Sequence, residues 1–119
     1  MLNFLAPIAL SLAQAAAVAQ PLPDLTLEQS SALRCSVAFG LVHQGQKAGN
    51  ADFSNYPVMA ERGQEFFVHT TARLMDDLGA DRDTIMALVV RETQALSDTP
   101  GRLDEVMPAC LLLLDASGL

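Results

Sequence analysis

The sequence predicts an all-α fold: a small four-helix domain whose first and last helices are central and linked by a disulfide, preceded by a signal peptide. Three observations lead to this prediction. Apolar residues recur with helical spacing between glycine- and proline-rich turns, and no strand-like alternation continues for more than a few positions. The first nineteen residues are apolar and carry no charged side chain. The chain has two cysteines, each within a strongly apolar stretch.

The segment 1–19 has the pattern of a cleaved signal peptide. It ends in alanines, with Ala17 and Ala19 at the −3 and −1 positions before Gln20, and Pro21 and Pro23 follow. Two other interpretations stay open. An uncleaved anchor of nineteen helical residues would reach about 28 Å, close to the roughly 30 Å hydrocarbon core of a bilayer, and a cytosolic amphipathic start is the third. The first two interpretations place residues 24–119 outside the cytoplasm.

Cys35 and Cys110 predict one disulfide. They are too far apart in the chain for a CxxC redox pair or a zinc knuckle, and two lone cysteines in an exported protein usually pair. The stretches RCSVAFGLV (34–42) and VMPACLLLL (106–114) are apolar on nearly every helical face, which is typical of helices in the middle of a fold. Two central helices touch, so the sulfur atoms come within reach. The alternative is a pair of buried free thiols.

The domain 27–119 follows a proline-rich lead over residues 20–26. A capping box of Thr26 and Gln29 starts the first helix, which is predicted over residues 27–47. Residues 49–57 form a loop by composition, and we expect Phe53 and Tyr56 to fold back onto the core.

Three more helices are predicted over residues 58–78, 82–97 and 102–116. In the second helix the apolar stripe comprises Phe67, Thr71, Leu74 and Leu78. Gly79 ends this helix and Asp81 caps the next, so the short turn makes the two helices antiparallel neighbours. In the third helix Ile85, Leu88, Val89 and Leu96 point inward. Pro108 either kinks the last helix or opens its second half.

Composition excludes several classes of partner. Seven Lys and Arg residues face fourteen Asp and Glu, a net charge of −7. Such a chain repels phosphate backbones and anionic lipid surfaces, so we expect no nucleic-acid partner. A membrane is expected only if the N-terminal segment is retained.

One charged face is the candidate interaction site. Spacings of three and four residues place Arg62, Glu65, His69, Arg73 and Asp76 on one side of the second helix, opposite the apolar stripe. A functional interpretation makes His69 a base or metal ligand oriented by Glu65. The alternating signs favour the simpler interpretation, a solvated face held by ion pairs within the helix.

Other chemistry-bearing residues have structural explanations. His43 near the end of the first helix interacts favourably with the helix dipole. The aspartates 76, 77, 81 and 83 surround a turn but lack the spacing of an EF-hand loop. Neither a nucleophile elbow nor a phosphate-binding glycine loop nor a haem-attachment motif occurs in the sequence. We therefore expect no enzyme activity, no cofactor and no metal.

Four segments together carry a resemblance: LRCSVAF (33–39), YPVMAERGQEFFV (56–68), ARLMDDLG (72–79) and VMPACLLLLDAS (106–117). In spacing and texture they resemble small exported helical proteins of Gram-negative bacteria that have one cysteine pair and no assigned activity. The resemblance covers about residues 28–118. It implies an exported, disulfide-linked helical domain and brings no functional residue.

These observations lead us to expect a periplasmic or secreted, non-enzymatic domain that binds another envelope protein. Two other functions fit the same sequence. One is a small, acidic periplasmic chaperone that protects against stress or acid. The other is an accessory subunit of a membrane complex that uses residues 1–19 as its span.

Overall fold

The computed structural model describes residues 21–119, which contain four α-helices and one short 3₁₀ helix. The α-helices are α1 (Leu27–Lys47), α2 (Arg62–Leu78), α3 (Arg82–Asp98) and α4 (Arg102–Ala116), and η1 (Ala51–Phe53) lies between α1 and α2. The predicted signal peptide lies outside the described residues. Residues 21–26 are an extended lead, and among residues 21–119 no helix is both long and apolar enough to span a bilayer.

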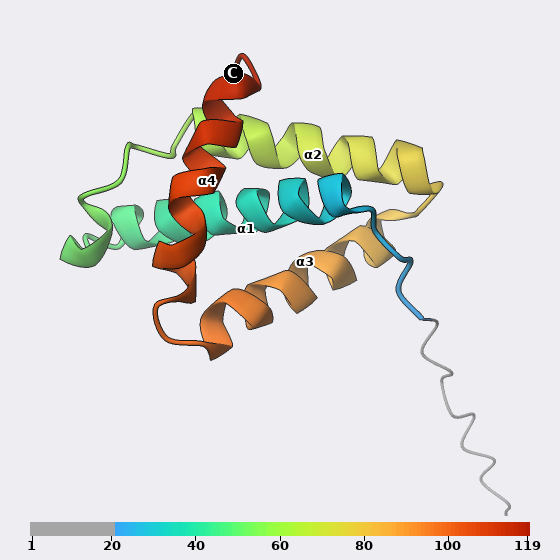
Figure 1. Ribbon diagram of the computed structural model, residues 1–119, viewed down its shortest axis with the longest axis horizontal. Coiled ribbons are helices and arrows are strands. Elements are labelled where there is room, and N and C mark those ends of the chain that lie inside the picture. Colours follow the sequence, from blue (N-terminus) through green and yellow to red (C-terminus); the bar gives the residue numbers. More distant parts are fainter. Residues whose placement is uncertain (1–20) are drawn as a thin grey trace, which may run out of the picture.

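Helix α1 forms the centre of the molecule. The capping box is present: the Thr26 hydroxyl accepts from the Gln29 backbone N–H, and the Gln29 side chain accepts from the Thr26 N–H. Every residue from Cys35 to Phe39 is buried, so the helix is covered on all sides at its middle. Figure 1 shows the reason, because α2 and α3 lie on either side of α1 and α4 crosses it. The prediction of a central first helix is confirmed.

The disulfide between Cys35 and Cys110 joins α1 to α4, as predicted. The two Cα atoms are 5.0 Å apart, within the usual range for this bond. Around it α4 buries Val106, Met107 and Leu114. The bond thus fixes the point at which the first and last helices cross. It is also consistent with an oxidising compartment.

The leucine run of α4 is less buried than its composition indicates. Leu114 is almost fully buried, but Leu112 is 73% exposed and Leu113 37% exposed. The expectation that this stretch is buried on every face is therefore wrong: a helix that crosses only one side of α1 has an outer face, and these side chains point outward. The helix is continuous through Pro108, which is exposed and does not break it.

Helices α2 and α3 form a hairpin whose arms diverge around α1. Gly79 ends α2 in the left-handed conformation, with φ of 59°, and the Asp81 side chain accepts from the Thr84 N–H to cap α3. Both capping predictions are confirmed. The two arms meet near the turn and separate farther along (Figure 1). Because α1 runs between them, most of their apolar side chains pack on α1 instead of on each other.

The buried face of α2 matches the prediction in part: Gly63, Phe66 and Leu74 are buried, and of these Leu74 belongs to the predicted stripe. Phe66 is buried and its ring packs edge-on against Phe39 of α1, with ring centroids 5.2 Å apart. Phe67, which was placed in the core stripe, is half-buried, as are Thr71 and Leu78. Val89 of α3 is also half-buried, although Ile85, Leu88 and Leu96 are buried as predicted.

Helix α2 begins at Arg62, four residues later than the predicted Val58, because Gln46 holds the preceding segment in an irregular path. The Gln46 side-chain amide lies 3.3 Å from the carbonyl oxygens of Phe53 and Tyr56 and donates to that of Pro57 at 2.9 Å. Its Oε1 accepts from the Met59 N–H. These four contacts cross seven to thirteen residues, so no local pattern predicts them.

Phe53 and Tyr56 pack against the core as expected. The Phe53 ring covers Gly45 so closely that a side chain at Gly45 would collide with it. The Tyr56 hydroxyl donates to the Asp104 carboxylate of α4. The loop between α1 and α2 is therefore attached to α1 and α4.

Candidate functional site

The five residues of the predicted interaction face are all exposed on one side of α2. The structure thus places Arg62, Glu65, His69, Arg73 and Asp76 as their spacing predicts. The ion-pair ladder within the helix does not form. Among the ion pairs of residues 21–119, none joins two of these five side chains.

Arg62 instead fastens α2 to the end of the chain. Its Nε donates to the Leu119 carbonyl oxygen at 2.7 Å, and its Nη2 lies 3.1 Å from Asp115 Oδ1. A second arginine, Arg34 of α1, pairs with the largely buried Glu92 of α3 at 3.2 Å. Two arginines therefore join helices of this chain. The sequence spacing found the face but not this connection.

The other candidates from the sequence do not form a chemical centre. Within the described part of the chain, no three His, Cys, Asp or Glu side chains come close enough to hold a metal ion. The Asp81 carboxylate is occupied in capping α3, and its hydrogen bonds with Thr84 lower its pKa. His43 lies in the last part of α1, as expected, and its side chain also lines a groove.

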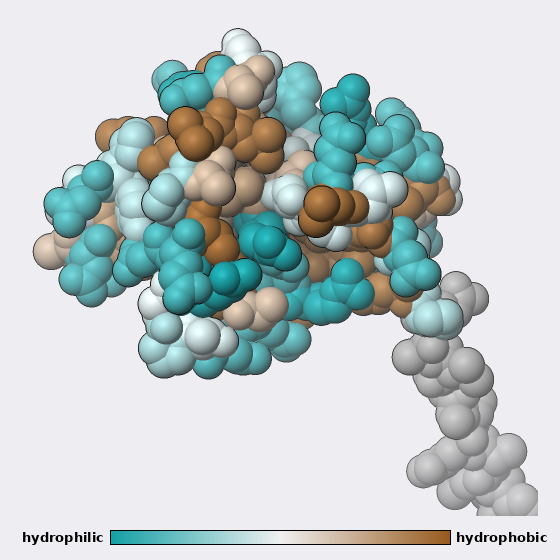
Figure 2. Space-filling model, in the orientation of Figure 1, coloured by the Kyte–Doolittle hydropathy of each residue, from teal (hydrophilic) through white to brown (hydrophobic). Residues whose placement is uncertain are grey.

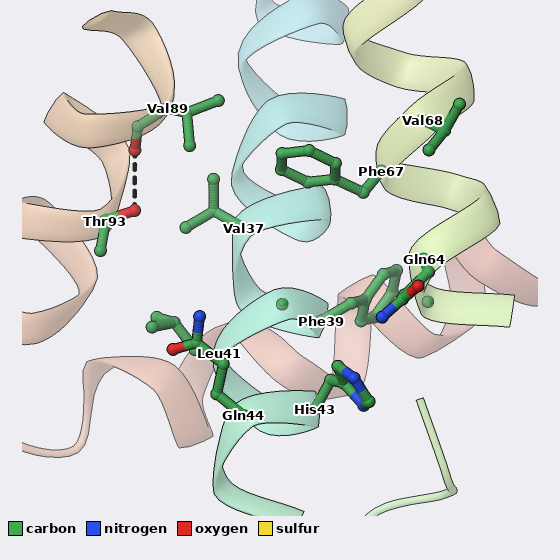
Figure 3. Close-up of a pocket in the computed structure, with 12 residues that line it drawn as sticks. Val37, Phe39, Leu41, His43, Gln44, Gln64, Phe67, Val68, Val89 and Thr93 are labelled. Atoms are coloured by element: carbon green, nitrogen blue, oxygen red, sulfur yellow. Dashed lines mark hydrogen bonds between the residues drawn. The ribbon is translucent and has the colours of Figure 1, made fainter. Parts of the chain in front are cut away.

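This groove is a feature that the sequence did not reveal. It has a volume of about 350 Å³ and lies over α1 between α2 and α3, on the side of α1 away from α4 (Figure 3). Its size is in the range of sites that bury a ligand. We call it the central groove. Its lining comprises Val37, Phe39, Gly40, Leu41, His43, Gln44, Gly63, Gln64, Phe67, Val68, Val89 and Thr93.

The lining of the central groove contains no Asp, Glu, Lys or Arg, although the chain around it carries 21 such residues. Figure 3 shows the polar side chains of His43, Gln44 and Gln64 at one end, with the apolar Phe67 and Val89 farther along. His43 is the one ionisable residue of the lining, and it has no nucleophile beside it. The groove therefore offers apolar contact with a few polar groups at one end, which suits binding better than catalysis.

Gly40 leaves the floor of the central groove open. A Cβ added there would have no neighbouring atom within 4 Å. The other glycines within α1 and α2 have close neighbours, unlike Gly40. Gly45 of α1 is covered by Phe53, and a Cβ at Gly63 of α2 would lie about 3.0–3.2 Å from Met59 and Phe39. The packing of this chain thus explains Gly45 and Gly63 but not Gly40. A glycine inside a helix costs roughly 0.5–1 kcal/mol relative to alanine.

Apolar side chains in the lining of the central groove, and next to it in sequence, are exposed to solvent. Val68 of α2 is 62% exposed, and Met86 and Val90 of α3 are 49% and 51% exposed. Single exposed apolar residues are ordinary, but Val68 lines this uncharged hollow, and Met86 and Val90 lie within one helical turn of the lining residue Val89.

No family model matches the sequence, and no curated protein or solved structure is similar to it at a significant level. The site is therefore characterised by its own geometry: an uncharged groove with an open glycine floor and exposed apolar edges.

Proposed function

We propose that this chain is an exported, non-enzymatic binding domain that holds one amphipathic helix of another protein in the central groove. Gly40 carries the proposal. The walls of the groove are α2 and α3, and its floor is α1. Because Gly40 has no side chain, a helix of the partner protein can approach α1 closely. Helix-in-groove docking of this kind uses apolar anchors spaced three and four residues apart.

Export to the periplasm or beyond is part of the same proposal. The Cys35–Cys110 bond supports it, because disulfides persist mainly outside the reducing cytosol. The apolar, uncharged segment 1–19 and the resemblance to small exported helical proteins support it as well.

Site-specific photo-crosslinking in the cells that make the protein tests this function. A benzoylphenylalanine replaces Val90 at the edge of the groove, and a matched control replaces the exposed Ala95, which helical geometry places on a different side of α3. We expect one crosslinked partner protein from position 90 and none from position 95. The crosslinked peptide of the partner should have helical apolar spacing.

Filling the floor of the groove provides the second arm. Gly40→Leu introduces a side chain where this chain has no neighbouring atom, so the fold is retained while the groove is occupied. We expect the crosslink from position 90 to disappear in this variant. An unchanged crosslink in a folded Gly40→Leu protein, or equal products from positions 90 and 95, would refute the proposed function.

A chaperone that protects other proteins under stress is the second candidate, and the outer face of α4 supports it. Figure 2 shows apolar residues along this helix, where Leu112 and Leu113 are exposed beside Ala109 and Ala116. Below about pH 4, where carboxylates protonate, such a protein should bind an apolar dye more strongly while it stays helical. A protein that remains dye-silent and does not prevent aggregation there would exclude this function.

A further inference from the structure

We infer that the helix held by the central groove is cationic, with Lys or Arg on both sides of its apolar face. This inference rests on the proposed function. It concerns the chemistry of the partner, and it follows from the charges on the two walls of the groove.

The walls are acidic. With their N-cap residues, α2 and α3 contain eight carboxylates and four arginines, a net charge of −4 out of −7 for the whole chain. Because the lining itself is uncharged, this field acts on whatever lies in the groove without a fixed ion pair inside it. An anionic or uncharged helix gains nothing from such walls, while a cationic helix is attracted to them.

Three carboxylates lie along the outer ridges of the walls, together with exposed apolar residues. On α2, Glu61 and Glu65 continue through Val68 at spacings of four and three, so the three lie on one face. On α3, Asp83 and Val90 are seven residues apart and also share a face. All five are exposed. A helix seated between these ridges has its flanks opposite Glu61 and Glu65 on one side and Asp83 on the other.

Two basic residues lie near the ends of the groove. Arg82 precedes Met86 and Val89 on the groove side of α3, close to the turn, and Lys47 ends α1. Arg73 shares the charged face of α2 with Glu65, but it lies eight residues farther along the helix, beyond the lining residues Gly63, Gln64, Phe67 and Val68. Arg62 is paired with Asp115, and Arg91 is two residues from Val89, which places it on the opposite side of α3. The bases therefore lie at the ends of the groove or away from it.

The wall charge also argues against a second copy of this chain as the occupant. Each copy has a net charge of −7, so two copies repel each other at the approach that an uncharged groove requires. A cationic helix instead combines apolar burial with attraction at both flanks. Charge complementarity thus selects one occupant from those that an apolar groove admits.

Labelled synthetic peptides of about 18 residues test the inference, because a helix of that length can form on binding. Three peptides share one apolar face and carry lysine, glutamine or glutamate on the flanks. Fluorescence anisotropy with the oxidised protein should give an affinity for the lysine peptide about tenfold above that for the glutamate peptide at low salt. In 0.5 M salt, where the screening length falls to roughly 4 Å, the difference should fall to about twofold or less.

A charge reversal with a matched control assigns the effect to the walls. Glu65→Lys changes a ridge residue, and Glu28→Lys makes the same change in net charge at the far end of α1. We expect Glu65→Lys to weaken binding of the lysine peptide by about threefold or more at low salt, and Glu28→Lys to have less than half that effect. Equal effects would mean that only net charge matters and would overturn the inference.

The remaining outcomes separate this inference from the proposed function. If all three peptides bind equally and Gly40→Leu abolishes binding, the groove binds helices but the partner is not selected by charge. If the peptides bind Gly40→Leu as well as the original protein, the groove is not the site and both proposals fail. If sedimentation shows that the protein dimerises and Gly40→Leu makes it monomeric, a second copy fills the groove and the cationic helix is ruled out.

Discussion

Loss of the bond between Cys35 and Cys110 is the perturbation whose cost follows most directly from the structure. The bond closes a segment with a sequence separation of 75 residues. In the chain-entropy model a loop of that size removes unfolded-state freedom worth about 4.5 kcal/mol at 25 °C. Domains of this size have total stabilities of about 5–15 kcal/mol. The double variant Cys35→Ala/Cys110→Ala should therefore lose about 30% or more of its free energy of unfolding.

Urea denaturation followed by far-ultraviolet circular dichroism measures this loss. With a denaturant dependence of about 1–3 kcal/mol/M, the midpoint should fall by about 1.5–4.5 M relative to the oxidised protein. The original protein kept in reductant is the control, and it should denature close to the double variant. A midpoint that moves by less than about 0.5 M would show that the bond does not limit the unfolded chain, and the entropic reasoning would be wrong.

Three further predictions follow from the contacts described above. Burial, together with the hydrogen bond and charge of Asp104, raises the pKa of Tyr56 to about 12. The stabilising effect of Tyr56 is therefore complete below about pH 10 and is lost as the pH rises towards 12. Because the chain has one Tyr and no Trp, absorbance at 295 nm reports this ionisation alone, and a native midpoint near pH 10 would contradict the prediction. Gln46→Ala should cost about 1–3 kcal/mol and accelerate amide exchange at Met59, whereas unchanged exchange there would show that Gln46 does not hold the segment before α2. A non-reducing intact mass should correspond to a chain that begins at Gln20 and lacks two hydrogen atoms, and retention of residues 1–19 or reaction of the denatured protein with a thiol reagent would contradict the signal peptide or the bond.

The sequence predicted the features of the fold that depend on local chemistry. The Thr26 capping box, Gly79 and Asp81 mark helix ends because they satisfy backbone groups within a few residues. The cysteine pair was also predictable, since two apolar stretches with one thiol each leave few alternatives. The start of α2 was not predictable, because it depends on Gln46 bonding residues up to thirteen positions away.

The candidate site was harder to predict because it depends on how helices are placed relative to one another. Helical periodicity finds an apolar face, but it cannot determine that α1 separates the arms of the hairpin. For this reason Phe67 was placed in the core stripe, whereas it lines the central groove. Val89 packs against the core as predicted and also lines the groove. Gly40 carried no signal in the sequence, since a glycine within a helical pattern has several explanations. Only the coordinates show that Gly45 and Gly63 have neighbours and Gly40 has none.

The position of the two thiols has a consequence for biosynthesis. During translation Cys35 emerges 75 residues before Cys110. All of α2 and α3 are synthesised between the two cysteines. In that interval any other thiol that it meets belongs to a different molecule, because the chain has only two. Because Cys35 lies where α4 crosses α1, its protection from such encounters is complete only when α4 packs there. Overproduction that outpaces this packing should yield disulfide-linked dimers through Cys35, and a Cys110→Ser chain should accumulate them.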